Sequence, residues 1–193
     1  MNDKLWKLTE RLTDVCIFGV LWLVCSLPIV TVGAASAALH AAMGDRLTLG
    51  SRERVKPFFR AFRLHFRKAT ILWLTIFPLM IVFALDAVYY LVWNGDGVWN
   101  RAMGAVQVLL FVHAFAISCY AFPLLTLYNR KVRDVLLLSL QSCYRHWPWT
   151  LLILAVHAAA VALLWIGLWP YIYLFAGMLG YVSSLIMVRI LRE

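Results

Sequence analysis

Residues 69–92 read ATILWLTIFPLMIVFALDAVYYLV, and Asp86 is the one charged residue in the stretch. A helix that crosses a bilayer needs about 20 mostly apolar residues. Three further stretches meet that requirement, at residues 102–128, 149–168 and 171–188. Backbone amides in hydrocarbon have no water to bond, so each stretch must be helical. The sequence therefore predicts an all-α fold, a polytopic transmembrane helical bundle forming a single integral membrane domain over residues 1–193.

The composition is typical of a membrane protein. Apolar residues make up 64% of the 193 residues and the mean hydropathy is +0.82, whereas soluble domains are about 45–50% apolar. The net charge of +9 comes from basic residues placed between the apolar stretches, so we expect anionic lipids, and no nucleic acid, as a partner. The four cysteines have no C-x-x-C or metal-ligand spacing, which argues against a disulfide framework or a redox motif.

The N-terminal apolar run leaves two topologies open. Residues 15–43 contain no Lys, Arg, Asp or Glu, and the run is long for one span and short for two. Pro28 and Gly33 interrupt it, and proline ends or kinks a helix. We predict two helical pieces, residues 14–29 and 31–47, with Thr31 as the N-cap of the second. A hairpin gives six passes, and one kinked span gives five.

The basic residues predict the orientation in the membrane. All but Arg101 of the 18 Lys and Arg lie in the N-terminal tail, in residues 44–68, in residues 128–147 or at the C-terminus. Short cytoplasmic segments of membrane proteins carry such an excess of Lys and Arg, which places these four segments on the cytoplasmic side of the membrane when the N-terminal run is a hairpin. A cleavable signal peptide ending near residues 35–37 is the alternative. It is disfavoured because the basic segment after it would have to cross the membrane.

Residues 56–68, KPFFRAFRLHFRK, form an amphipathic pattern. At about 100° per residue, the phenylalanines lie on one side of a helix and the basic residues near the opposite side. The residues that we expect at this surface are Phe58, Phe59, Arg60, Phe62, Arg63, Phe66 and Arg67. The pattern predicts a cytoplasmic interfacial helix. It acts either as a topology anchor or as a docking surface for a partner.

A few polar residues lie inside the predicted spans. They are His113, His157 and Asp86. Ionisable groups within a membrane are functional candidates, and the two histidines are candidates for a proton or substrate path. Small residues recur every four positions at Gly33, Ala37 and Ala41, which allows close helix packing inside the chain or in a homo-oligomer.

The sequence lacks the common catalytic motifs. It contains no H-E-x-x-H, no G-x-x-x-x-G-K-[ST] and no G-x-S-x-G, which are the motifs of zinc proteases, P-loop proteins and serine hydrolases. We therefore predict no catalytic residues, no metal and no cofactor, and a protein that is not an enzyme. A membrane enzyme acting on lipid or lipid-linked sugar is the least favoured alternative.

Three stretches together resemble the YesL family, also called the domain of unknown function 624. They are LWLVCSLPIVTVGAASAAL at residues 21–39, FFRAFRLHFRKAT at 58–70 and AFPLLTLYNRKVR at 121–133. The first contains Leu27, Pro28, Thr31 and Gly33, at the predicted helix turn. His65 stands where the family usually has Asn.

The resemblance implies a bacterial membrane protein whose family members have genes beside those for carbohydrate ABC transporters and sugar utilisation. It therefore implies an accessory or regulatory role in carbohydrate uptake, with an ABC transporter or a sensor protein as partner. The resemblance supplies no catalytic residues. A small membrane transporter or channel is the alternative function.

Overall fold

The computed structural model describes residues 2–49, 53, 55–93, 97–128, 130–165, 167 and 172–190, and every regular element in that part of the chain is helical. The α-helices are α1 (Asn2–Cys25), α2 (Val32–Leu49), α3 (Val55–Val88), α4 (Val98–Tyr128), α5 (Val132–Arg145), α6 (Trp147–Trp165) and α7 (Ile172–Ile190). A 3-10 turn, Ile29–Thr31, precedes α2, and a π-helical turn, Tyr89–Trp93, extends α3. The all-α prediction is confirmed over these residues.

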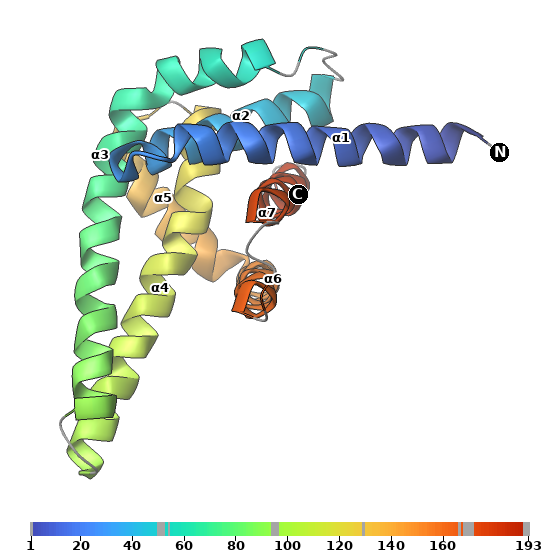
Figure 1. The fold of residues 1–193 in the computed structure, drawn as a ribbon. Helices are drawn as coiled ribbons and strands as arrows, with labels where there is room; N and C mark the ends of the chain where they lie inside the picture. The colour runs from blue at the N-terminus through green and yellow to red at the C-terminus, as the bar shows by residue number, and fades with distance from the viewer. Residues whose placement is uncertain are drawn as a thin grey trace.

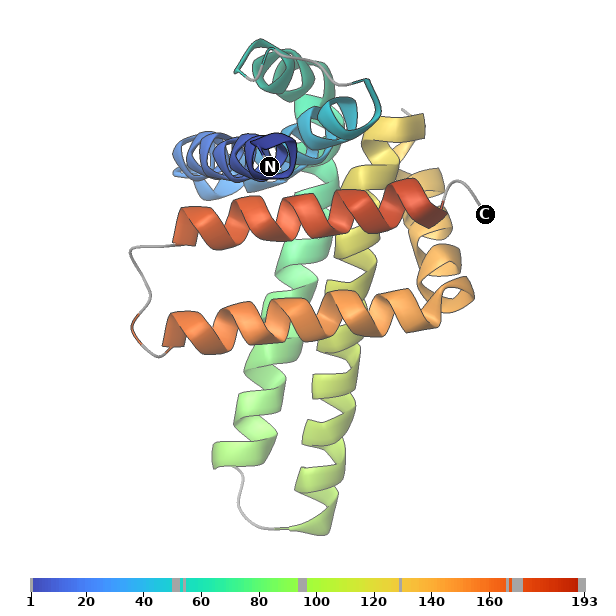
Figure 2. The same ribbon diagram turned by 90° about the vertical axis from the view of Figure 1, so that its right-hand side faces the viewer.

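The helices are arranged around one long antiparallel pair, α3 and α4 (Figure 1). α1 lies across one end of this pair, and α2 lies beside α1. α6 and α7 run across the pair, so they are seen end-on in Figure 1 and lengthwise in Figure 2. The far half of the α3–α4 hairpin extends beyond the other helices.

Two of the described helices are long and apolar enough to cross a membrane by length and composition. They are the helix Val55–Trp93, which joins α3 to its π-helical turn, and α4. A third candidate is the pair formed by α5 and residues Trp147–Leu163 of α6, which are bent by 98° at their junction. The prediction of five or six crossing helices goes beyond these two or three candidates and stays a prediction.

α3 merges two segments that the sequence analysis had separated. Residues 56–68 and 69–92 were predicted as an interfacial helix followed by a span, yet the helix runs without interruption from Val55 to Val88. Between Phe58 and Phe77 there is no glycine or proline, so nothing in the backbone ends the helix there. Figure 1 shows instead that α3 bends, with its first turns lying across the end of the long pair.

α5 was not predicted, because its residues were assigned to a cytoplasmic connection. One face of the helix is buried through Val135, Ser139 and Cys143, which recur at helical spacing. Asp134 lies in its first turn and Arg145 in its last, where each charge complements the helix dipole. The several polar and charged residues concealed this short amphipathic helix.

The break between α1 and α2 lies at Pro28, whose backbone is extended at φ −77° and ψ 121°. Thr31 directly precedes α2, at the position predicted for its N-cap. Its hydroxyl donates to the carbonyl oxygens of Cys25 (2.6 Å) and Pro28 (2.7 Å), and Cys25 is the last residue of α1, where carbonyls lack partners within the helix. The indole N–H of Trp73 donates to the Ile29 carbonyl (2.9 Å) and attaches the break to α3.

A buried ion pair joins α1 to α2. The Arg46 Nε donates to the Asp14 carboxylate at 2.7 Å, and the two side chains are 14% and 6% exposed. In one continuous helix these residues would be roughly 48 Å apart, at 1.5 Å per residue. The chain therefore reverses direction at the break, and α1 and α2 form a hairpin.

Small residues allow the helices to approach closely. A Cβ on Gly19 would collide with the backbone of Tyr173, and one on Gly177 would collide with the backbone of Val15, so α1 and α7 touch through glycine. A Cβ on Gly33 would lie 2.6 Å from the Ala69 carbonyl oxygen of α3. The alanines of α2 that are fully or almost fully buried are Ala34, Ala35, Ala37, Ala38 and Ala42. Most of the small residues of α2 thus serve packing inside the chain.

We expect the Asp14→Ala variant to lower the free energy of unfolding by about 3–5 kcal/mol, because it leaves the Arg46 charge buried without its carboxylate. Glu53→Ala is the matched control. Glu53 pairs with Lys56 at 3.1 Å, but the two side chains are 60% and 83% exposed, and exposed ion pairs contribute little to stability. Denaturant unfolding of both variants in detergent measures the difference. Equal stability of the two variants would contradict a structural role for the buried pair.

Candidate functional site

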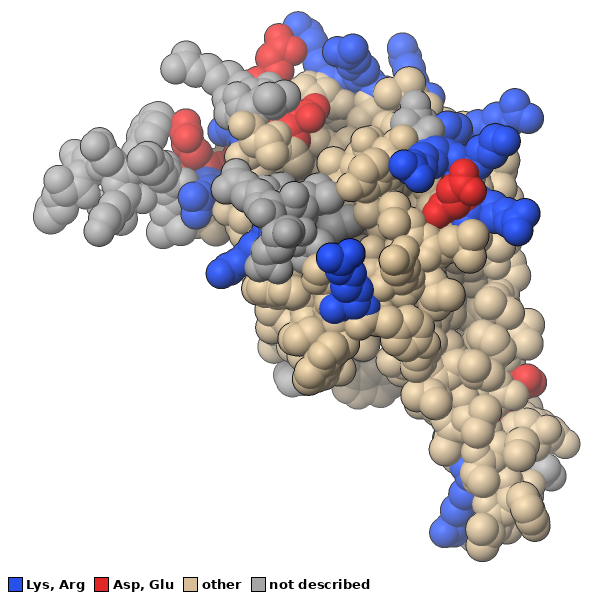
Figure 3. Space-filling view, turned by 180° about the vertical axis from the view of Figure 1, so that it is seen from behind, with Lys and Arg blue, Asp and Glu red and all other residues tan. Residues whose placement is uncertain are grey.

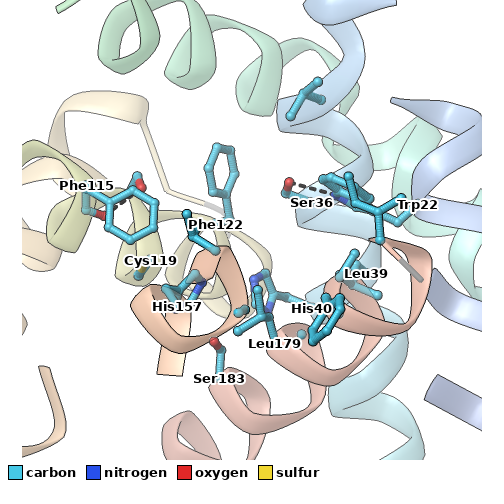
Figure 4. A pocket seen from close by; sticks show the side chains of 18 of the residues that line it. Trp22, Ser36, Leu39, His40, Phe115, Cys119, Phe122, His157, Leu179 and Ser183 are labelled. Carbon is cyan, nitrogen blue, oxygen red and sulfur yellow. Dashed lines mark hydrogen bonds between the residues drawn. The ribbon is translucent and has the colours of Figure 1, made fainter. Parts of the chain in front are cut away.

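A cavity of about 440 Å³ lies among α1, α2, α3, α4, α6 and α7. Its wall is mostly apolar, with five aromatic side chains besides the histidines: Trp22, Trp73, Phe115, Phe122 and Phe175. The polar side chains in the wall are Ser36, His40, Ser118, Cys119, His157 and Ser183. Figure 4 shows that these groups come from helices on opposite sides of the space. The volume lies within the range of small-molecule sites, about 300–1,000 Å³.

His157 of α6 has a defined tautomer. Its Nδ1 lies 2.8 Å from the Ile153 carbonyl oxygen, and a carbonyl oxygen can only accept, so Nδ1 carries the proton. The ring packs edge-on against Phe115, with centroids 5.2 Å apart. The neutral ring therefore keeps Nε2 as a hydrogen-bond acceptor at the cavity wall.

His40 of α2 lies in the same wall (Figure 4). Its Nδ1 is 3.4 Å from the Ser184 hydroxyl of α7, a long contact in which either tautomer fits. This residue was missed by the sequence analysis, although it lies inside the predicted helix 31–47. It is the one ionisable side chain in the run of small residues from Val32 to Met43, and that contrast was the available signal.

The cavity serines differ in their partners. The Ser36 hydroxyl accepts from the Trp22 indole N–H at 3.1 Å. The Ser118 hydroxyl donates to the Phe115 carbonyl at 2.6 Å. Ser183 is 6% exposed and also lines the cavity. Ser183 thus adds a hydroxyl to the wall on the side of α7.

The structure does not bring His113 and His157 together in this cavity, and the path through them stays a prediction. His113 does not line the cavity. Its Nδ1 lies 3.0 Å from the Leu109 carbonyl of its own helix, and its ring faces Tyr144 of α5 at 5.9 Å. The two histidines occupy positions on different helices, α4 and α6, and their side chains turn to different neighbours. Asp86, near the end of α3, also lies outside the cavity wall.

The amphipathic part of α3 forms a second candidate surface. Arg60, Arg63 and Arg67 are exposed, as predicted for a basic face. Phe59 and Phe66 are 42% and 39% exposed. Figure 3 shows that most of the described Lys and Arg gather at this end of the molecule, whereas the flank of the long hairpin is nearly free of charge.

Two phenylalanines of this surface lie differently from the prediction. Phe58 is fully buried in a cluster with Phe18 and Met43, so it cannot lie at the acyl boundary of a membrane. Phe62 is partly buried against the same cluster. The α1–α2 hairpin covers this part of the apolar face, which periodicity within one segment cannot reveal.

The motif residues at the turn have separate roles. Leu27 and Pro28 are exposed at the break, and Thr31 bonds the end of α1. Gly33 lies directly against the side chain of Trp73, where a Cβ would come within 2.5 Å of the Trp73 Cβ. This motif therefore shapes the turn and seats α2 on α3.

A family comparison matches this same region. Residues 15–87 match the family described as "Protein of unknown function, DUF624". This part of the chain is similar to that family, and the match covers less than half of the 193 residues. The match runs from α1 through α2 to near the end of α3 and agrees with the resemblance carried by the first two sequence motifs, at residues 21–39 and 58–70. No curated protein and no solved structure matches the chain.

No metal centre is evident in the described part of the chain. Three or more His, Cys, Asp or Glu side chains do not come together there in a way that could hold an ion. Among the described residues that line the cavity there is also no Lys, Arg, Asp or Glu. The chemistry available in the cavity is therefore neutral hydrogen bonding and apolar contact.

A buried network holds α6, and with it His157, in place. The Thr150 hydroxyl lies 2.9 Å from both the Tyr120 hydroxyl of α4 and the Cys143 carbonyl of α5. Because the carbonyl must accept, Thr150 donates to Cys143 and accepts from Tyr120. The network crosses the junction where α5 and α6 are bent by 98°.

We expect Thr150→Val to lower the free energy of unfolding by about 1–3 kcal/mol, because the buried Tyr120 hydroxyl loses its partner. Thr75→Val is the control, since the exposed Thr75 hydroxyl bonds only the Ile71 carbonyl of its own helix (2.9 Å). Thermal unfolding of purified protein in detergent compares the two. A larger loss for Thr75→Val would contradict this role of Thr150.

Proposed function

We propose that the chain is a multi-pass protein of the bacterial cytoplasmic membrane. In this proposal it carries out no chemistry of its own and acts as an accessory or regulatory partner of a carbohydrate-uptake ABC transporter. The observation that carries the membrane assignment is the uncovered apolar surface of the α3–α4 hairpin, whose far half projects beyond the other helices (Figure 2). Exposed side chains there include Leu79, Val82, Leu85, Met103, Val106 and Leu109.

Such a surface is unstable in water, because burial of apolar area is worth roughly 25 cal/mol per Å². Large exposed apolar patches mark contacts with a membrane or another protein. α6 supports the same conclusion, since it has no charged residue and exposes Leu151, Leu152, Val161 and Leu163. A lipid environment around α3, α4 and α6 removes this cost.

The orientation is proposed from the charges. The basic end of the molecule (Figure 3) would face the cytoplasm and its anionic lipids, where each Lys or Arg near the surface contributes about 1 kcal/mol. Arg101, in the first turns of α4, lies at the opposite end of the long hairpin. In this orientation the first turns of α3 form the interfacial helix, with Arg60, Arg63 and Arg67 directed to the headgroups or to a partner.

The number of passes is proposed to be even. The α1–α2, α3–α4 and α6–α7 pairs each reverse the chain (Figures 1 and 2). A hairpin returns the chain to the side on which it began, whether it crosses the membrane twice or only enters it. α6 and α7 run across the α3–α4 pair (Figure 2), so up to six passes are proposed, and both termini lie in the cytoplasm in this proposal. The five-pass topology would place the N-terminus outside.

The accessory role rests on the family resemblance and on the exposed basic face of α3. The resemblance implies association with carbohydrate-uptake genes, and the basic face offers charged groups that do not take part in the core. A membrane-embedded or cytoplasmic domain of the uptake system with an acidic surface is the partner that fits these charges.

A small transporter or channel is the second candidate function. The cavity and its two histidines favour it, because a transport pathway requires a space with polar groups inside the protein. The scarcity of polar groups in the wall weighs against a sugar as cargo.

We expect the N-terminus to be cytoplasmic. A Thr9→Cys variant, with the four native cysteines replaced by alanine, should not react with an impermeant maleimide on intact cells and should react after the cells are opened. Asn100→Cys, at the far end of the α3–α4 hairpin, is the control and should react on intact cells. Labelling of Thr9→Cys on intact cells would contradict a cytoplasmic N-terminus and with it the even number of passes.

We expect a carbohydrate ABC transporter subunit to co-purify with the full-length protein from native membranes in mild detergent. Reversing the basic face with Arg60→Glu and Arg63→Glu should reduce its recovery at least several-fold. The matched pair Arg130→Glu and Lys131→Glu, exposed between α4 and α5, should have a smaller effect. Quantitative mass spectrometry measures the recovery. Purification of a homo-oligomer alone would count against the accessory role.

A further inference from the structure

We propose that the cavity among α2, α4, α6 and α7 is a binding site for an uncharged, largely apolar molecule that carries a hydroxyl group. The apolar part of this ligand would lie against the aromatic wall, and its hydroxyl would bond His157 and Ser183. This site is independent of the accessory role, because it depends on the cavity alone and not on the basic face of α3.

The wall selects against charge. A charged group placed in an apolar cavity needs a counter-charge or several hydrogen bonds. The described residues of the wall supply no Lys, Arg, Asp or Glu. A carboxylate, a phosphate or an ammonium group would therefore lose hydration without compensation, and the ligand must be neutral.

The wall also selects against a sugar. A monosaccharide carries several hydroxyls, and each one that is buried without a partner reduces binding. Trp22, Phe115, Phe122 and Phe175 cover much of the wall and offer no hydrogen bonds from the cavity-facing rings, since the Trp22 indole N–H is already bonded to Ser36. An alkyl or isoprenoid chain fits such a surface, because apolar contact needs no polar partner.

His157 supplies a specific acceptor. The proton on Nδ1 is engaged by the Ile153 carbonyl at 2.8 Å, so Nε2 has a lone pair and no proton. The edge-on packing of Phe115 fixes the plane of the ring. A ligand hydroxyl can donate to this nitrogen, whereas an alkane cannot make the contact.

Ser183 supplies the complementary donor. Ser183 lines the cavity, and Figure 4 shows its oxygen directed towards the region that His40 and His157 also face. A ligand hydroxyl that donates to His157 can accept from Ser183 with its own oxygen. One alcohol group would thus satisfy both side chains.

The test is equilibrium binding of tritiated 1-decanol to the purified full-length protein in a fluorinated surfactant, whose chains mix poorly with hydrocarbon. We expect one saturable site per chain. His157→Phe and Ser183→Ala should each raise Kd roughly three- to tenfold, the effect of one neutral hydrogen bond. Ala176→Phe, which fills the cavity from α7, should abolish the binding. Decanoate and glucose at the same concentration should not compete.

His113→Phe is the matched control, because His113 bonds its own helix as His157 does but does not line the cavity. It should bind 1-decanol as the unsubstituted protein does. Thermal unfolding confirms that each variant is folded, and Ser183→Ala keeps the test decisive if His157→Phe is unstable. Absence of saturable binding, equal affinity in Ser183→Ala, or displacement by glucose would each overturn the proposal.

Discussion

The buried ion pair between Asp14 and Arg46 determines the arrangement of the first half of the chain. Two charges removed from water are costly unless they meet, and in this chain they meet only if α2 folds back along α1. That reversal presents Gly33 and the alanines of α2 to α3 and α7. It also places His40 in the cavity wall. Apolar packing has no direction and would not by itself fix how α2 lies along α1. The ion pair fixes this arrangement.

The glycine contacts explain how a cavity can exist in a closely packed molecule. α1 and α7 touch at Gly19 and Gly177 with their backbones in contact, which holds α7 against the α1–α2 hairpin. α6 is held separately by the Thr150 network at its junction with α5. Each of these two helices is thus fixed by a different neighbour, and the space left between them is not closed by side chains of the described residues.

The sequence predicted the positions of the helices along the chain better than the way in which they pack against one another. Long apolar stretches identified α4, α6 and α7 within a few residues, because a single segment contains the signal. α5 was missed because its apolar face is short and interrupted by charges. α3 was divided because hydropathy changes at Lys68, whereas the helix bends there without ending (Figure 1). The cavity could not be predicted, because it depends on which helices cross one another. It also depends on the orientation of His157, set by the Ile153 carbonyl, and of His40, which contacts Ser184. The motif near Pro28 correctly indicated the break between α1 and α2, because it contains the proline of the turn and Gly33, which contacts Trp73.

The basic face of α3 and the wall of the cavity suit two different kinds of interaction. The basic face of α3 is hydrated and can exchange partners without disturbing the core, because its arginines are exposed. The wall of the cavity is mostly apolar and has no Lys, Arg, Asp or Glu among its described residues, so under the proposals above its occupant comes from the membrane. α2 connects the two: its Arg46 is paired with α1 near the basic end, and its His40 lies in the wall between. Occupation of the cavity would press on α2, and α2 packs directly on α3 through Gly33. A ligand within the membrane and a partner at the cytoplasmic surface would then act on the same helix pair.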